Sequence, residues 1–213
     1  MKDARFEELR EGIYQELLKA NQHFKIFWGM RLASKDIAKV MNVYLTFFYY
    51  TMWCNNDRFC LGIYNVIKPD KDTANFTKLF NYIISNENLS KIFNQREINK
   101  MEVIIQSHKN LIDRIKVVRD QYIAHNQLTK NHLKEDTTYK YEEGEKLLKD
   151  LNKILDKLSY KYDNSRYWHD NSGLLDVSPG LNLEDMLRDL TEHRNDQIKR
   201  TREAVKHAQT SYD

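Results

Sequence analysis

Residues that interrupt helices or cross-link chains are scarce in this sequence. Its 213 residues include only two prolines, six glycines and two cysteines. So little proline and glycine leaves few points at which long helices must end, and neither a strand pattern nor a glycine-rich phosphate loop is evident. Cys54 and Cys60 stand without the further Cys and His residues that a zinc site or a disulfide framework requires. The sequence therefore indicates neither, and its cysteine content fits a reducing cytosol.

A strong charge of one sign and a long apolar run are also missing. The formal net charge of +3 permits an RNA partner without demanding one. The most apolar run, residues 40–54, is shorter than the about 20 apolar residues that a membrane-crossing helix needs. The first residues are charged and amphipathic, unlike a signal peptide. We therefore expect a cytoplasmic protein with no membrane, metal or cofactor, in which residues 40–54 form a buried helix.

The remaining composition is typical of a folded, helix-rich protein. Charged residues make up 31% and hydrophobic residues 41% of the chain. Apolar residues recur at helical spacing in several segments. Helices are predicted over residues 4–19 with an extension towards 28, from about 34 to 67, from about 73 to 83, near 88–93, from about 96 to 124, over 147–162 and over about 182–208.

Individual residues predict where the second helix begins and ends. Ser34 or Asp36 is its expected N-cap, because their side-chain oxygens can accept hydrogen bonds from the first backbone N–H groups. Pro69 disfavours the helical conformation in the residue before it, so this helix must stop by Lys68. The aromatic cluster at 47–50 lies in a segment that is apolar nearly all round, so we expect it in the core.

We predict a single all-α domain over residues 1–213, an antiparallel helical bundle with a C-terminal helical extension. Its parts are a bundle core over about 36–163, an irregular loop over 163–180 and a last helix over about 182–208. Asp72 or Thr73 is the expected N-cap of the short third helix, and Asn182 that of the last helix. Beyond Thr191 the apolar face of the last helix fades, so this half either projects from the bundle or packs on a partner.

The most informative segment begins at Arg119 and closes the helix predicted over 96–124. The apolar stripe of this helix consists of Met101, Ile104, Ile105, His108, Leu111, Ile112, Ile115, Val118 and Tyr122. At about 100° per residue, Arg119 points into this stripe. A guanidinium is always charged and its unpaired burial is unfavourable, so Arg119 needs a carboxylate, another subunit or a phosphate ligand. His108, on the same stripe, is predicted to be a buried core residue.

The run RDQYIAHN that starts at Arg119 resembles the signature of the HEPN superfamily (higher eukaryotes and prokaryotes nucleotide-binding domains). In that signature an Arg, usually followed by a polar residue, precedes a His by four to six intervening positions. Here Asp120 follows Arg119, and five residues separate Arg119 from His125. The run is similar to the abortive-infection, phage-resistance branch, and residues 46–83 resemble the aromatic-rich helix and short Leu-Phe segment of that branch. The resemblance covers roughly residues 36–163.

The resemblance implies a bundle of the HEPN type and a dimeric, metal-independent endoribonuclease, with a role in phage defence or a toxin–antitoxin pair. In that family two motifs meet across a dimer interface and form a composite site. His125 would be the acid or base and Arg119 the phosphate ligand, with Asp120 in an accessory role. A neutral His can accept the proton of a ribose 2′-hydroxyl, and an Arg can bind a phosphate bidentately. The product would be a 2′,3′-cyclic phosphate, and the implied partners are RNA, a second copy and an antitoxin.

Four further residues around the motif are predicted to bind RNA. Arg114 and Lys116 lie on the basic face of the motif helix, where they would attract the phosphate backbone. Tyr122 and Asn126 lie close to His125 in the sequence. These residues would place RNA beside the catalytic pair.

Two other interpretations of the motif stay open. In a structural one, Arg119 pairs with a buried acid such as Asp57, and His125 caps the helix C-terminus, where the dipole favours a cation. In the other, the chain is a non-catalytic HEPN-like protein that binds RNA or nucleotides or serves as a dimeric scaffold. Six positions on a regular helix put Arg119 and His125 about 120° apart, so they share a face only if the helix breaks near Ala124.

Overall fold

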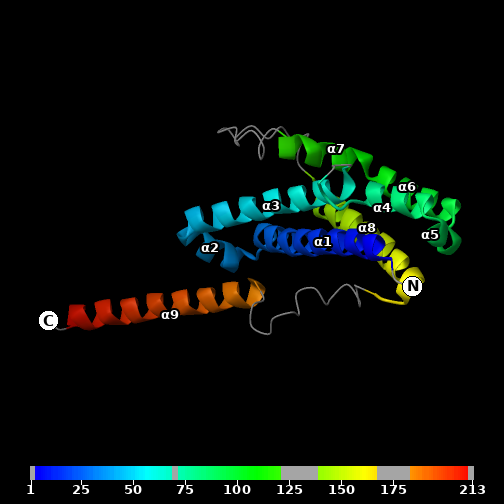
Figure 1. Ribbon diagram of the computed structural model, residues 1–213. Coiled ribbons are helices and arrows are strands. Elements are labelled where there is room, and N and C mark those ends of the chain that lie inside the picture. The colour runs from blue at the N-terminus through cyan, green and yellow to red at the C-terminus, as the bar shows by residue number, and fades with distance from the viewer. Residues whose placement is uncertain (1–2, 69–71, 121–138, 167–182, 211–213) are drawn as a thin grey trace.

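Helices account for all the regular secondary structure in the described part of the chain. The computed structural model describes residues 3–68, 72–120, 139–166 and 183–210 (Figure 1). Their helices are α1 (Ala4–Arg31), α2 (Lys35–Val43), α3 (Leu45–Ile67), α4 (Phe76–Ser85), α5 (Glu87–Ile92), α6 (Gln95–Ser107), α7 (Lys109–Val118), α8 (Tyr141–Asp163) and α9 (Leu183–Thr210). The prediction of an all-α fold is therefore confirmed.

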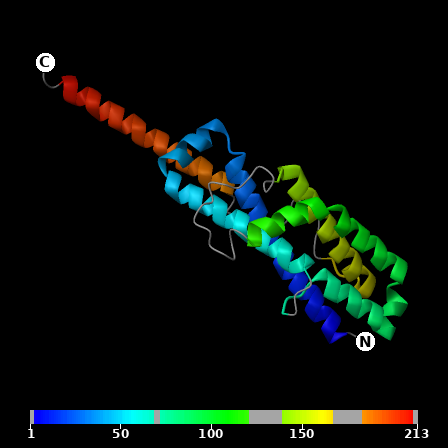
Figure 2. The same ribbon diagram turned by 90° about the horizontal axis from the view of Figure 1, so that it is seen from above.

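Helices α1 and α3 form the centre of the bundle, where they lie side by side and run in opposite directions (Figures 1 and 2). Helix α8 packs against α1, α7 packs against α3, and α6 packs against α8. The buried residues of α1 recur every three or four positions, so one face of the helix meets the core. They include Phe6, Leu9, Ile13, Leu17, Ala20, Phe24 and Phe27.

The two central helices approach each other closely at Gly62 of α3. A Cβ atom at this position would lie 3.0 Å from the Cβ of Ala20 and 3.3 Å from the carbonyl oxygen of Glu16. The missing side chain at Gly62 therefore allows the backbones of α1 and α3 to pack at short distance.

The ends of the second predicted helix lie where the sequence places them. Ser34 is the N-cap of α2, and its hydroxyl oxygen accepts a hydrogen bond from the backbone N–H of Ile37. Helix α3 ends at Ile67, and its C-cap residue Lys68 has an extended backbone. This conformation is the one that a following proline, here Pro69, imposes on its predecessor.

Two helices that were predicted to be continuous are each interrupted once. The helix expected from about 34 to 67 breaks at Tyr44, which separates α2 from α3. The helix expected over 96–124 breaks at His108, which separates α6 from α7. Neither break contains proline or glycine. Apolar periodicity continues across both positions, so the sequence pattern does not reveal them.

The N-cap of α4 is Asn75 rather than Asp72 or Thr73. Its side-chain oxygen accepts a hydrogen bond from the backbone N–H of Lys78 at 2.9 Å, while its amide nitrogen donates to the carbonyl oxygen of Thr73 at 3.1 Å. Asn75 is fully buried. A buried amide that satisfies groups on both sides of the helix start is favoured at this position over the two preceding candidates.

The buried apolar residues form one large cluster and one small cluster. The large cluster draws residues from α1 and from α3 through α8. The small cluster consists of Met30, Phe48 and Leu187, from α1, α3 and α9. The last helix is therefore attached to the bundle through a separate and much smaller apolar contact.

The prediction of a core position for the aromatic cluster at 47–50 is wrong for three of its four residues. Phe48 is buried, but Phe47 is 63%, Tyr49 42% and Tyr50 65% exposed. The break at Tyr44 places them at the start of α3, at the end of the molecule where α1 has finished (Figure 1). The wider expectation of a buried helix over 40–54 fails for the same reason.

Helix α9 projects beyond the end of the body that α2 and α3 form (Figures 1 and 2). Residues 192–204 are exposed except for the half-buried Arg194. Over the described residues, the second half of α9 therefore projects from the bundle. This is one of the two arrangements predicted from its fading apolar face. The predicted cap Asn182 lies outside the described residues. Among the helices described, none has the length and apolar character needed to cross a membrane.

Candidate nucleic-acid-binding site

The described part of the motif lies at the C-terminal end of α7. Arg119 is the C-cap residue of this helix, and its backbone N–H donates to the carbonyl oxygens of Ile115 and Lys116. His125, Tyr122 and Asn126 lie outside the described residues, so the structure locates the beginning of the motif only.

The side chain of Arg119 is half-exposed and not enclosed in the core, contrary to the expectation from the apolar stripe. It is 32% exposed, and its Nη1 donates to Oδ1 of Asp120 at 2.6 Å. The direction from the sequence is nonetheless right, because the guanidinium carbon lies 4.5 Å from the ring centroid of Tyr64 in α3. Position 119 follows the last buried residue of the stripe, Val118, at the point where α7 ends. Water therefore reaches the guanidinium.

Two cationic side chains contact the aromatic ring of Tyr64. Its ring is buried, and besides Arg119 it contacts the ammonium of Lys68, whose Nζ lies 4.7 Å from the ring centroid. Both distances are within the range of cation–π attraction. The Tyr64 hydroxyl is buried and has no hydrogen-bond partner in the described part of the chain. Tyr64 thus contacts one charge from the end of α7 and one from the end of α3.

Asp120 balances only part of this positive charge. The hydrogen bond from Arg119 is the main reason that the pKa of Asp120 lies below its usual value, and Lys116 and Lys68 lower it further against the effect of burial. Asp120 is therefore ionised at neutral pH. Tyr64, Lys68, Lys116, Arg119 and Asp120 are called the Tyr64 cluster below. Among the described residues of the cluster, three cations stand beside one carboxylate.

Arg114 and Lys116 of α7, which are both predicted to bind RNA, have different neighbours. Lys116 is exposed and acts on Asp120, as part of the Tyr64 cluster. Arg114 instead donates from Nη2 to Oε1 of Glu143 in α8 at 2.6 Å. Arg114 thus ties α7 to the start of α8. The structure brings Lys116, Arg119 and Asp120 together, and it does not bring Arg114 into that group.

Sequence reasoning did not identify Tyr64 and Lys68 as part of the site. They precede Arg119 by about fifty positions, and no spacing in the sequence joins them to it. Their one local signal is that Lys68 follows the last residue of a helix that ends before Pro69. The packing of α7 on α3 is what brings them to Arg119.

His108 sets the direction of α7 by separating it from α6. As predicted, it is buried, and its Nε2 lies 2.9 Å from Oδ2 of Asp150 in α8. This contact holds the break between α6 and α7 against α8. Helix α7 can then follow α3 independently of the course of α6, which follows α8. The break therefore positions Arg119 above Tyr64.

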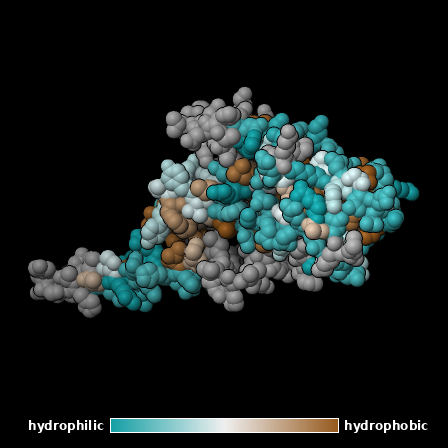
Figure 3. Space-filling model, viewed as in Figure 1, coloured by the Kyte–Doolittle hydropathy of each residue, from teal (hydrophilic) through white to brown (hydrophobic). Residues whose placement is uncertain are grey.

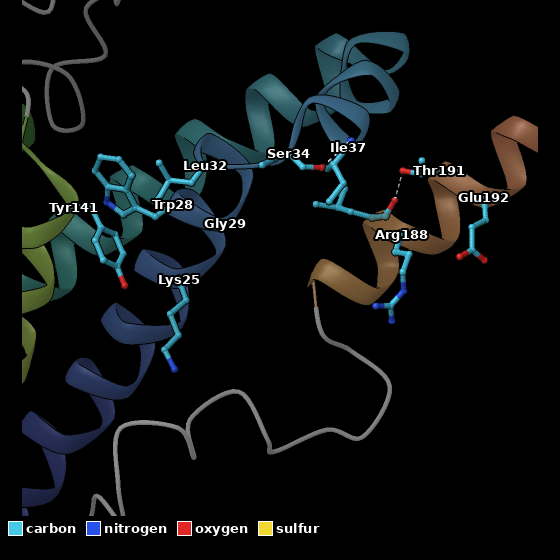
Figure 4. A pocket seen from close by; sticks show the side chains of 12 residues that line it. Lys25, Trp28, Gly29, Leu32, Ser34, Ile37, Tyr141, Arg188, Thr191 and Glu192 are labelled. Atoms are coloured by element: carbon cyan, nitrogen blue, oxygen red, sulfur yellow. Dashed lines mark hydrogen bonds between the residues drawn. The ribbon is translucent and has the colours of Figure 1, made fainter.

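A separate cavity of about 780 Å³ lies between the end of α1, α2 and α9 (Figure 4). Trp28, Leu32 and Ile37 contribute apolar side chains, and Lys25 and Arg188 contribute charges. Of the predicted site residues that the structure describes, none lines it. Over the described residues, no group of three or more His, Cys, Asp or Glu side chains is placed to hold a metal ion.

Comparison with known proteins finds no relative of this chain. The chain matches no protein-family model, no curated protein and no solved structure.

Proposed function

We propose that this protein is a metal-independent endoribonuclease of the HEPN type, with a role in phage defence or as a toxin. Arg119 binds the phosphate in this proposal, and His125 transfers the protons. The observation that carries it is the placement of Arg119. Its half-exposed guanidinium is held by Asp120 and Tyr64, beside Lys68 and Lys116.

The Tyr64 cluster has the charge and the geometry to bind a phosphodiester. A guanidinium has five N–H donors in a planar fork, so Arg119 can bind Asp120 and a phosphate oxygen at the same time. Two lysine ammonium groups nearby add attraction for the polyanionic backbone. The ion pair and the aromatic contact restrict the rotamers of Arg119 before RNA arrives, which lowers the entropy lost on binding.

The reaction needs two proton transfers. A neutral His125 accepts the proton of the ribose 2′-hydroxyl, and the 2′-oxygen attacks phosphorus. The bond from phosphorus to the 5′-oxygen breaks, and a protonated His125 gives that oxygen its proton. Arg119 stabilises the charge that grows on the non-bridging oxygens. The products are a 2′,3′-cyclic phosphate and a 5′-hydroxyl. In the arrangement that the resemblance implies, two copies of the motif supply these groups together.

RNA or nucleotide binding without cleavage is the second candidate function. The described members of the Tyr64 cluster support it because they supply the anion binding that this function requires. The two candidates differ only in what His125 does. In a pure scaffold, Arg119 would serve dimer packing alone.

The first test is cleavage of a labelled, mixed RNA pool in the presence of EDTA. We expect the wild type to cut and to leave cyclic phosphate ends. His125→Ala should lower the rate by at least about 100-fold through loss of acid–base catalysis, and Arg119→Ala by about 100-fold through loss of charge stabilisation. Arg96→Ala is the matched control, because Arg96 is an exposed cation of α6 outside the Tyr64 cluster.

Each outcome separates the candidates. If His125→Ala cuts RNA as well as the wild type, the ribonuclease proposal fails. If no protein cuts but Arg119→Ala binds RNA more weakly than Arg96→Ala, the second candidate is favoured. If Arg119→Ala changes neither RNA binding nor cleavage, the Tyr64 cluster is not the binding site, and loss of dimer in that variant would favour the scaffold.

A further inference from the structure

An unusually large apolar surface lies where α2 ends and α3 begins. Six large side chains on this surface are between 42% and 65% exposed: Val43, Tyr44, Leu45, Phe47, Tyr49 and Tyr50. We call them the tip surface. In Figure 3, brown and pale atoms gather at this end of the body, beside the teal surface of α9. Single exposed apolar residues are ordinary, whereas six adjacent ones are not.

The tip surface is exposed because neighbouring helices cover α3 unevenly along its length. The C-terminal half of α3 lies between α1 and α7, and its residues Phe59, Ile63 and Val66 are fully buried. The N-terminal half meets α2 and the end of α1, and of its first six residues only Phe48 is buried. Over the described residues, the chain therefore leaves the first turns of its most apolar helix largely uncovered.

The area of the tip surface fits one side of a stable protein interface. With exposed fractions of 42–65% and full areas of about 150–250 Å² for large side chains, the six residues expose roughly 700 Å². A typical monomer has a largest apolar patch of about 300–600 Å². A standard interface buries about 800 Å² on each partner. Leu45 and Phe47 lie on opposite sides of α3, so a second molecule that encloses the start of this helix can bury an area close to what stable association needs.

The charges around the tip surface favour an identical copy as that second molecule. No Asp, Glu, Lys or Arg occurs from position 40 to position 56. Two copies can therefore meet face to face without bringing like charges together, which is the usual obstacle to self-association. Helices that lie on lipid carry lysine and arginine on the face beside the apolar one, and this segment has neither. Tyrosine and phenylalanine are also enriched at protein interfaces.

We propose that the tip surface is an interface between two copies of this chain. In a two-fold arrangement each copy presents the same surface to the other. Helix α9 projects past the tip surface in Figures 1 and 2, so its exposed half would lie alongside the partner. Tyr50 and Tyr64 are fourteen positions apart on α3, about 21 Å along the helix. The interface thus lies away from the Tyr64 cluster, so it is separate from the contact between two motifs in the proposed ribonuclease and does not depend on that activity.

The test is the mass of the full chain in solution, measured by light scattering at increasing concentration. We expect the wild type to reach twice its chain mass of 25.6 kDa at concentrations up to about 100 µM. The double variant Phe47→Glu/Tyr50→Glu should raise the dissociation constant by at least about 30-fold, because each dimer then holds four carboxylates in an apolar contact. Leu45→Lys alone should act in the same direction.

The control variant is Val103→Glu, at a position of α6 that is 67% exposed and outside the tip surface. It should dimerise like the wild type. Circular dichroism of the variants should match the wild type, since Phe47 and Tyr50 are 63% and 65% exposed and lie outside the core.

Three results would overturn the proposal. One is a wild type that stays monomeric over the whole concentration range. Another is a dimer that the tip variants leave intact, which would direct attention to the end of α7. The third is a monomer that floats with vesicles of phosphatidylcholine and phosphatidylglycerol, which would assign the tip surface to a membrane. RNA cleavage enters none of these readouts, so failure here is distinct from failure of the proposed function.

Discussion

Two arginines of this chain lie in opposite surroundings, and the sequence pattern selects the wrong one for burial. Arg10 of α1 has a side chain that is only 9% exposed, and its Nη1 donates to Oδ2 of Asp163 at 2.8 Å. Its guanidinium also lies over the rings of Phe6 and Tyr162. Arg119, on the most apolar stripe, is 32% exposed. A charged group is buried where a carboxylate and aromatic rings receive it, and two of these partners of Arg10, Asp163 and Tyr162, come from a distant segment.

This contrast predicts different costs for the two arginines. Arg10→Ala should lower the free energy of unfolding by about 2 kcal/mol, because it removes the hydrogen-bonded ion pair with Asp163 and the packing of the buried Arg10 side chain on Phe6 and Tyr162. Arg119→Ala should lower it by less than about 1 kcal/mol, as for an exposed ion pair. Urea denaturation of both variants at neutral pH measures the difference. Equal losses would show that Arg119 is as structural as Arg10, which would weaken the proposed function.

Asp3 makes the start of α1 sensitive to acid. The backbone N–H of Phe6 donates to its carboxylate at 3.0 Å, and this bond is the main reason that the pKa of Asp3 is lowered. The Tyr82 hydroxyl and the Asn86 amide donate to the same carboxylate, at 2.9 Å and 3.0 Å. A group whose folded pKa is depressed stabilises the fold above its unfolded pKa of about 3.9 and ceases to do so as the pH falls through the folded value.

The prediction concerns the substitution Asp3→Asn. The amide oxygen can still cap α1, but the titration is gone, so the variant should lose less stability between pH 7 and about pH 3 than the wild type does. Asp3→Ala should lose about 1 kcal/mol at pH 7 because the cap is removed. Thermal unfolding across this pH range tests both. Parallel pH profiles for wild type and Asp3→Asn would contradict the assignment.

At the scale of helices, the sequence predicts starts and stops that depend on one or two neighbouring residues. Ser34 caps α2, and Pro69 limits α3, because each acts on backbone atoms within four positions. The breaks at Tyr44 and His108 are different. The break at His108 coincides with a contact to Asp150 of α8, and no proline or glycine forbids a continuous helix at either position.

The candidate site divides in the same way. The sequence identifies Arg119 and Asp120 because their motif is local. It cannot identify Tyr64 and Lys68, since only the packing of α7 on α3 brings them to the guanidinium. It also misjudges the exposure of Phe47, because the spacing of apolar residues tells which face of a helix is apolar and not where along the helix the neighbouring helices end.

Gly144 provides a test of helix packing in α8. A Cβ at this position would lie 2.5 Å from Cε2 of Phe24, a buried ring of α1 that has no room to turn. Gly144→Ala should therefore lower the free energy of unfolding by about 1 kcal/mol, since overpacking outweighs the gain in helix propensity. Gly29→Ala is the matched control, because Gly29 is in α1 and lines the cavity beside α9. It should stabilise by up to about 1 kcal/mol. Two variants of equal stability would refute this packing argument.

At the scale of the whole molecule, the two apolar clusters predict two independent stabilities. Leu187 is almost fully buried in the small cluster that holds α9. Leu187→Ala should increase hydrogen exchange in α9 and leave the exchange of α1 and α3 unchanged, because elements with few buried contacts open locally.

Leu151→Ala is the corresponding change in the large cluster, at a fully buried position of α8. It should lower the free energy of global unfolding by about 2–5 kcal/mol through the cavity it leaves. Exchange in α1 and α3 should then accelerate together. If Leu187→Ala destabilised α1 and α3 to the same extent, the small cluster would belong to the main cooperative unit.

The pairing of α1 with the end of α8 has a consequence for the order of events during synthesis. Tyr162 packs on Phe6 and accepts a hydrogen bond from the backbone N–H of Asp3, and Asp163 pairs with Arg10 across 153 positions of the chain. At a translation rate of about 5–20 residues per second, these partners emerge roughly 8–30 s after α1. For that interval the apolar face of α1 has no final partner at its N-terminal end. A nascent chain stalled before α8 should therefore be a substrate for chaperones that bind exposed apolar helices.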